Sequence, residues 1–147
     1  MSKDNLLRLV KHYEGCRLTA YKDPVGVWTI GYGETAGVKK GMKISQEIAE
    51  ALLERRLADL WLDVDDFITR YIPSHAHEAL CSFAYNVGLG ALKRSTLLKK
   101  VLSGAPDEEI TAEFMKWTKA GGKVLPGLVK RRQAEAHLYT TGEVLLI

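Results

Sequence analysis

A change in hydrophobic period at Gly15 constrains the fold of this chain more than any other feature. Before Gly15, apolar residues recur at helical spacing, which predicts an amphipathic helix of about three turns with Ser2 as its N-cap. After it, the segments CRLTAY and VWTIGYG have strand composition and are separated by KDPVG, which predicts a β-hairpin. A hairpin folded back on the helix would lie close to its last residue, Glu14.

From Ser45 onward, the pattern is helical throughout. An apolar stripe after a Ser45 cap predicts a long helix that runs to about Arg70 and stops before Pro73. Further helix-length patterns follow, each with Pro, Ser or Asp near its start and Gly at or near its end: HEALCSFAYNVG, STLLKKVLSG, PDEEITAEFMKWTKAGG and PGLVKRRQAEAHLYTTG.

The predicted fold class is therefore α+β, mostly helical. We expect one domain over residues 1–147, which is long enough to bury a core. In this domain a small β lobe of about residues 14–45 is joined by the long helix to a helical lobe of about residues 46–147. The first helix is expected to pack on the helical lobe.

Composition places few limits on function. A hydrophobic fraction of 46% with 27% charged residues is ordinary for a soluble globular protein. Lysine and arginine number 21 against 18 acidic residues, and this net charge of +3 favours approach to an anionic polymer without identifying one. The sequence has no pattern typical of nucleic-acid binding, no window that predicts stable membrane insertion, and no secretory signal at its N-terminus.

Cysteine and histidine spacing indicates no metal site. Cys16 and Cys81 lack CxxC spacing, so free thiols are expected, although a disulfide between them stays open. His75 and His77 lie two residues apart, which points them to different faces of a helix. We interpret them as solvated residues at a helix start, and we predict no metal or other cofactor.

Two acids and one hydroxyl form the candidate site. Glu14 ends the first helix, where the negative pole of the helix dipole disfavours a charged carboxylate, as suits a general acid. Asp23 is held in the hairpin turn because Pro24 keeps it out of helical geometry, and Thr29 lies on the return strand. Two carboxyl groups facing across a gap are typical of glycoside hydrolysis. From the residues alone, surface acids beside a structural hairpin remain the alternative.

The segment YKDPVGVWTIGYG, preceded by Glu14 and Gly15, resembles the signature of phage-type lysozymes, the endolysins of glycoside hydrolase family 24. The later segments ALCSFAYNVG, STLL and LPGLVKRRQAE resemble further landmarks of that family. The resemblance implies a lysozyme-like fold and hydrolysis, with inversion, of the β-1,4 bond between N-acetylmuramic acid and N-acetylglucosamine in peptidoglycan. It also implies that Glu14 is the general acid, and that Asp23 and Thr29 position the attacking water.

Further cleft residues follow from the same resemblance. Thr35, just past the second strand, and Thr96, at the start of a later helix, are expected to contact the substrate. Tyr85 and Asn86 lie on a helix that would face the cleft. Tyr85 could stack on a sugar ring, but an aromatic residue in an apolar helix is more often part of the core.

Two charged positions leave alternatives open. Arg131 or Arg132 could reach the acid pair or the anionic stem of the substrate, whereas Arg131 could instead pair with Glu135 one helical turn away. The chain also departs from the family pattern at Glu34, where many relatives carry a histidine that can pair with an acid on the long helix. That support is expected to be absent or inverted here.

The resemblance also implies partners and a setting. The substrate is bacterial peptidoglycan, the protein is expected to be a monomer, and its activity causes lysis of the host cell. We expect synthesis in the host cytoplasm without a signal peptide and release that depends on a separate pore-forming protein. The rival functions are a lytic transglycosylase on the same polymer and a non-catalytic peptidoglycan-binding module.

Overall fold

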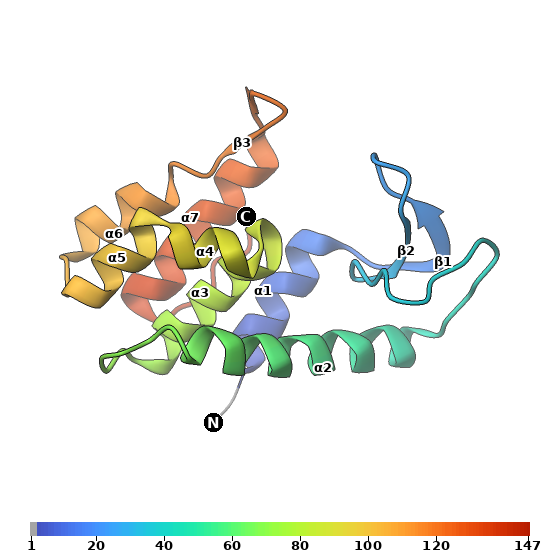
Figure 1. Cartoon of the computed structure of the whole chain (residues 1–147), viewed down its shortest axis with the longest axis horizontal. Coiled ribbons are helices and arrows are strands. Elements are labelled where there is room, and N and C mark those ends of the chain that lie inside the picture. The colour runs from blue at the N-terminus through green and yellow to red at the C-terminus, as the bar shows by residue number, and fades with distance from the viewer. Residues whose placement is uncertain (1–2) are drawn as a thin grey trace.

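The computed structural model describes residues 3–147, so the predicted N-cap at Ser2 lies outside the described residues. The N-terminal part contains one helix, a two-stranded sheet and a long helix: α1 (Asp4–Glu14), β1 (Arg17–Lys22), β2 (Trp28–Gly31) and α2 (Gln46–Asp65). Figure 1 shows α2 extending from beside this sheet to the helical end of the molecule. The α+β class with a helical majority is confirmed.

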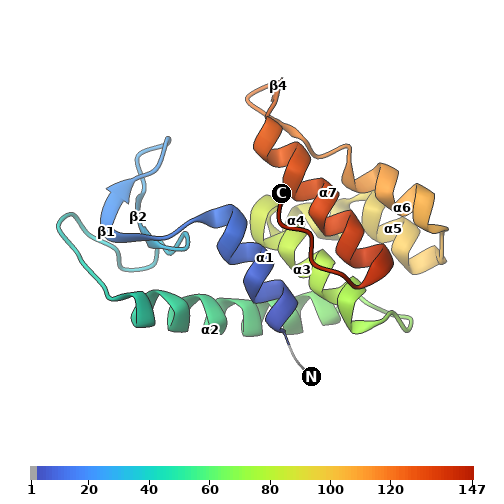
Figure 2. The same ribbon diagram turned by 180° about the vertical axis from the view of Figure 1, so that it is seen from behind.

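The C-terminal part is built around one buried helix. Its elements are α3 (Ser74–Val87), α4 (Leu89–Arg94), α5 (Thr96–Ser103), α6 (Asp107–Phe114), β3 (Lys119–Ala120), β4 (Lys123–Val124) and α7 (Pro126–Thr141). Helix α3 packs against α1, α2, α4 and α7. The C-terminal segment then returns along α1, where Nε2 of His12 lies 3.5 Å from the carbonyl oxygen of Ile147 (Figure 2).

Helix α1 is fixed on the helical part at its start. Leu6, Leu9 and Val10 are completely buried on one face. The backbone N–H of Leu6 donates to Oε2 of Glu78 on α3 over 2.9 Å, which satisfies one of the free donors at the helix start. Burial raises the pKa of Glu78. Because α1 is held by this bond and by its apolar face, the position of its last residue depends on α3.

The small sheet is an antiparallel hairpin, as predicted. Tyr21 pairs with Thr29, and a register irregularity lies between Arg17 and Tyr21. Residues 42–44 run beside β1, where the N–H of Ala20 donates to the carbonyl of Met42 over 2.9 Å. The hairpin therefore has a covered edge on the side of β1.

Helix α2 begins where predicted but ends early. The hydroxyl of Ser45 accepts the N–H of Ile48 over 3.2 Å, so the predicted cap is confirmed. The helix stops at Asp65 rather than near Arg70. Its end carries several aspartates and no basic residue, and negative charge at the negative pole of the dipole disfavours further helix.

The pattern over residues 106–122 does not form one helix. Helix α6 ends at Phe114, and the chain then forms the β3–β4 hairpin. Gly121 and Gly122 connect the strands with φ of +59° and +79°, which suits a type I′ turn. The short helix α4 was also not predicted, because Gly88 was interpreted only as a helix end.

The prediction of solvated histidines at the start of α3 is wrong for His77. Its ring is 6% exposed and stacks on Trp61 with a centroid separation of 3.7 Å. Nε2 lies 3.1 Å from the carbonyl oxygen of Trp61, and burial lowers the pKa of His77. His75 is half-buried, with Nδ1 2.9 Å from the carbonyl oxygen of Leu138. The apolar face of α2 covers the first turn of α3, and the sequence of α3 alone does not predict this burial.

Candidate active site

Glu14 is the last residue of α1, as predicted. Gly15 follows with φ of +68°, a conformation that suits glycine and ends the helix. Oε2 of Glu14 accepts a hydrogen bond from Nη1 of Arg131 over 2.5 Å. Oε1 points toward the turn after β2, where a Cβ atom at Gly33 would lie 3.8 Å away. Within residues 3–147, Oε1 accepts no hydrogen bond, so one oxygen is held and the other is free.

Arg131 fulfils both of its predicted alternatives at once. Besides the bond to Glu14, its Nε donates to Oε2 of Glu135 over 3.1 Å, and its Nη2 donates to the carbonyl of Ser82 over 3.0 Å. The side chain is 3% exposed. Burial alone would lower the pKa of Arg131, but the ion pairs with Glu135 and Glu14 raise it. A permanently charged guanidinium therefore fixes Glu14 against α3 and α7.

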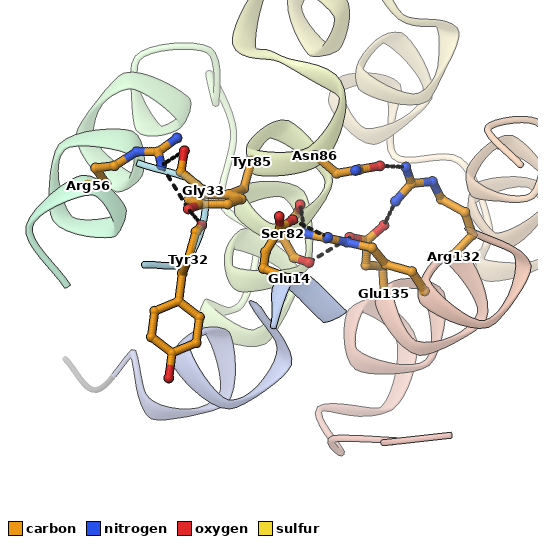
Figure 3. A network of polar contacts seen from close by, with 10 residues as sticks. Glu14, Tyr32, Gly33, Arg56, Ser82, Tyr85, Asn86, Arg132 and Glu135 are labelled. Atoms are coloured by element: carbon orange, nitrogen blue, oxygen red, sulfur yellow. Dashed lines mark hydrogen bonds and ion pairs between the residues drawn. The ribbon is translucent and has the colours of Figure 1, made fainter. Parts of the chain in front are cut away.

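Glu135 is the centre of this network (Figure 3), and its side chain is completely buried. Its carboxylate also accepts bonds from the hydroxyl of Ser82 and from Nη1 of Arg132, each over 2.6 Å. Arg132 in turn donates to the side-chain oxygen of Asn86. Positive and negative side chains alternate from Glu14 to Arg132, so the buried charges are paired.

Asp23 lies in the β1–β2 turn and is anchored by its own backbone. Oδ1 accepts the N–H groups of Val25 and Val27 over 3.0 and 2.8 Å. Such a pair of bonds is typical of an aspartate in a turn that includes proline and glycine. In the part of the chain that the structure describes, Oδ2 accepts no hydrogen bond, and it remains available to a ligand or water.

Thr29 lies on β2 and is 5% exposed. Its hydroxyl donates to the carbonyl of Val27 over 3.0 Å. Since the N–H of Val27 donates to Asp23, the carboxylate and the hydroxyl are both fixed at Val27. With its proton used in this way, the hydroxyl oxygen keeps lone pairs that can accept a hydrogen bond.

Glu34 pairs with Arg56 of α2, so the charge pattern of this pair is inverted rather than absent. Nη1 of Arg56 lies 3.2 Å from Oε1 of Glu34 and 2.9 Å from the hydroxyl oxygen of Tyr85. Tyr85 is half-buried and its ring is covered by the guanidinium at 4.5 Å. Beyond Tyr85 lies a cavity of about 350 Å³, lined by Arg56, Asp59, Leu60, Asp63, Ala84, Tyr85, Gly88 and Leu89. Sequence reasoning missed Arg56, which carries no local signal.

The other predicted substrate contacts lie in different surroundings. Thr35 is exposed in the loop after the Gly33 turn, and its carbonyl accepts the N–H of Val38 over 3.3 Å. Asn86 is exposed at the end of α3, with its side chain bonded to Arg132. Thr96 starts α5 and lines a separate depression with Glu113, Lys116 and Trp117. Substrate contact at these residues stays a prediction.

Both cysteines are free, with Cys16 partly buried and Cys81 fully buried, and burial raises the pKa of the Cys81 thiol. Within residues 3–147, no group of three or more His, Cys, Asp or Glu side chains is arranged to hold a metal ion. None of the described helices has both the length and the apolar character needed to cross a bilayer.

Comparison with known proteins shows which class of enzyme this chain resembles. An endolysin of Acyrthosiphon pisum secondary endosymbiont phage 1 is 45% identical over 141 residues, covering 90% of this chain and 93% of that protein. An endolysin of Bacillus phage B103 is 44% identical over 93% of this chain, which spans 53% of the phage protein.

Two solved structures support the same class of protein. The endolysin from Escherichia coli O157:H7 phage FAHEc1 matches 96% of this chain and 94% of its own, with 32% identity and a TM-score of 0.86. The muramidase domain of SpmX from Asticaccaulis excentricus matches 92% of this chain and 95% of its own, with 32% identity and a TM-score of 0.85. The fold and these matches define a lysozyme-type glycoside hydrolase that acts on peptidoglycan. The chain belongs to the phage lysozyme family, whose model matches residues 11–135.

Proposed function

We propose that the protein is an endolysin that cleaves the β-1,4 bond between N-acetylmuramic acid and N-acetylglucosamine with inversion, and that Glu14, Asp23 and Thr29 carry the reaction. The observation that supports this best is the state of Glu14. One oxygen of its carboxyl group is held by the buried Arg131, and the other points toward the turn after β2. A carboxyl group held in this way can meet a glycosidic oxygen in a fixed direction.

The reaction begins at the leaving oxygen. The proton on Glu14 passes to the glycosidic oxygen as the bond from that oxygen to the anomeric carbon breaks. Glu14 becomes a carboxylate, and Arg131 stabilises this product charge through the ion pair. The anchored guanidinium thus keeps the carboxyl group oriented throughout and stabilises the carboxylate that remains after the proton has moved.

Water attacks from the other face of the sugar. Asp23 accepts a proton from the water through Oδ2, because Oδ1 is occupied by two backbone N–H groups. Thr29 accepts a hydrogen bond from the other O–H of the water, which stays on the new anomeric hydroxyl, since the hydroxyl proton of Thr29 is already donated to the carbonyl of Val27. The water lone pair is then directed at the anomeric carbon, whose configuration inverts. An inverting pair of carboxyl groups stands about 6.5–9.5 Å apart, which leaves room for this water.

Replacement of the two acids tests these roles. We expect Glu14→Gln to reduce clearing of bacterial cell walls by about 10²–10⁴-fold, because glutamine keeps the shape but has no proton to donate. Asp23→Asn should be nearly as severe, whereas Asp23→Cys should retain activity, since a thiolate can accept the proton. Glu54→Gln, on an exposed part of α2, is the matched control. Clearing at the normal rate by folded Glu14→Gln protein would end the proposal.

A lytic transglycosylase is the second candidate, because it needs only the acid. In that reaction a hydroxyl of the substrate replaces water, and the product ends in a 1,6-anhydro sugar. The shared anchoring of Asp23 and Thr29 at Val27 favours a site that positions water. Mass spectrometry of the digested wall separates the two: a reducing muramic acid end supports hydrolysis.

We further propose that the protein acts as a monomer and reaches the wall from the host cytoplasm through a separate pore-forming protein. One relative favours the opposite route, release without a separate pore-forming protein: the protein of Enterobacteria phage PA-2, named a SAR-endolysin, is 36% identical over 88% of this chain. Expression in a bacterial cytoplasm with and without an inducible pore-forming protein tests the dependence. Lysis in both cultures would contradict it.

A further inference from the structure

The turn after β2 brings the backbone of the sheet next to the proposed acid. The N–H of Glu34 donates to the carbonyl of Ile30 over 2.8 Å, and the N–H of Ile30 donates to the carbonyl of Glu34 over 2.9 Å. Gly33 stands at the tip with φ of +100°, which disfavours any side chain there. Glu14 and Tyr85 both approach this glycine, so a small shift of the turn would change the space beside Glu14.

One side chain from α2 connects this turn to α3. Nη1 of Arg56 lies 3.1 Å from the carbonyl oxygen of Gly33, 3.2 Å from Oε1 of Glu34 and 2.9 Å from the hydroxyl oxygen of Tyr85. The side chain of Glu34 is only 12% exposed, and its carboxylate forms an ion pair with Arg56. Figure 3 shows Arg56, Tyr85 and Gly33 on one side of Glu14, and Glu135 and Arg132 on the other.

Tyr85 completes the connection. Its hydroxyl donates to the carbonyl oxygen of Tyr32 over 2.5 Å and receives the bond from Arg56. Burial raises the pKa of Tyr85, which keeps the hydroxyl protonated and able to donate. The guanidinium also lies over the ring at 4.5 Å. A planar guanidinium can cover a ring and bond several oxygens, whereas a lysine ammonium cannot do both in the same geometry.

We propose that Arg56 is a positioning residue of the hydrolytic site, which fixes the Gly33 turn and Tyr85 relative to Glu14. This inference rests on the proposed role of Glu14. The helical part holds Glu14 through Arg131, and Arg56 holds the facing wall. The distance between acid and sugar therefore depends on both arginines. Loss of Arg56 leaves the acid intact but lets the wall move, and displacements of this kind reduce turnover more than binding.

Steady-state kinetics on soluble, uncross-linked peptidoglycan oligomers test the proposal. Arg56→Ala should lower kcat about 10–100-fold with a change in KM of less than about threefold. Arg56→Lys should recover only a small part of kcat, because the ammonium keeps the pairing with Glu34 but not the bonds to Gly33 and Tyr85. Arg55→Ala removes the same charge from the next, exposed position of α2 and is the matched control.

A double-mutant cycle separates positioning from plain stabilisation. Tyr85→Phe removes the hydroxyl that joins Arg56 to Tyr32 and should lower kcat in the same way. The double variant should then be no slower than Arg56→Ala alone. All rates are taken well below the unfolding temperature of each variant, which calorimetry supplies.

The outcomes are distinguishable. If folded Arg56→Ala retains the kcat of Arg55→Ala, or if the kcat losses of Arg56→Ala and Tyr85→Phe multiply, the positioning role is overturned. Glu14→Gln is measured in the same assay. If it stays fully active, the proposed function fails whatever Arg56 does. If it is inactive while Arg56→Ala is normal, only the present inference fails.

Discussion

The buried network of ion pairs depends on the charge of the Glu135 carboxylate. Its neighbours Arg131 and Arg132 are 3% and 1% exposed, and both pair with it. We expect Glu135→Gln to reduce the free energy of unfolding by about 3–5 kcal/mol, because one partner of a buried ion pair is removed and guanidinium charge is left uncompensated. Urea denaturation at neutral pH measures this, with exposed Glu143→Gln as the control. A loss as small as that of the control would refute the assignment.

The buried Glu78 makes the free energy of unfolding fall as the pH rises, whereas a salt-bridged acid makes it rise. Burial raises its pKa above the ordinary value of 4.5, so the folded protein keeps this proton at a pH where the unfolded chain has lost it. Stability from this group is therefore complete below about pH 4.5 and is lost as the pH rises through the raised pKa. Glu78→Gln does not titrate but keeps an oxygen for the N–H of Leu6.

Unfolding at a series of pH values compares the two proteins. Between about pH 4 and about pH 7, the free energy of unfolding of the wild type should fall relative to that of Glu78→Gln. A constant difference across this range would contradict the prediction. His77, whose pKa is lowered by burial, acts in the opposite direction in both proteins and cancels in the comparison.

Single residues were predictable from sequence when their signal was local. Gly15 marks the helix end at Glu14, and Pro24 fixes Asp23 in its turn, since both effects act on the adjacent residue. Arg56 gave no signal, because its partners are 22 and 29 residues away in sequence and only the tertiary fold brings them together. Arg131 lay between these cases, because its ion-pair partner Glu135 is a helical turn away and its ion-pair partner Glu14 is 117 residues away.

At the scale of elements, two serine caps differ in burial and provide a matched test. Ser95 is 4% exposed, accepts the N–H of Leu98 and donates to the carbonyl of Leu92, so it joins α4 to α5. Ser45 caps α2 from an exposed position with a single bond. We expect Ser95→Ala to cost about 2 kcal/mol and Ser45→Ala about 0.5–1 kcal/mol. Thermal unfolding of both variants measures the difference, and equal losses would contradict it.

Element boundaries were less predictable than element types. The start of α2 was predicted correctly because Ser45 is a capping residue. Its end was not, because it depends on the charges of the last turn, which the pattern of apolar residues does not include. The β3–β4 hairpin was missed although Gly121 and Gly122 are a recognised turn signal, because the apolar pattern around them resembles a helix. Strands of two residues are too short for periodicity to detect.

At the scale of the whole molecule, the two proposed catalytic acids belong to different parts of the chain. Glu14 is placed by α1, which is held at its start by Glu78 and at its end by Arg131. Asp23 is placed by the hairpin, and the turn that follows that hairpin is bonded to α2 and α3 through Arg56. The geometry of the site therefore depends on how the sheet is held against the helices, and not on either element alone.

The net charge of the molecule gives a final prediction. With 21 basic and 18 acidic residues, the protein carries a formal charge of +3 and is attracted to an anionic cell wall. Added salt shortens the screening length from about 10 Å at 0.1 M to about 3 Å at 1 M, so clearing of intact walls should slow progressively over this range. Hydrolysis of short glycan oligomers whose muramic acid carboxyl groups are amidated should change far less, because these oligomers carry no charge while the bond cleaved is the same. Wall clearing that does not respond to ionic strength would show that contact forces, and not long-range charge, bring the enzyme to its substrate.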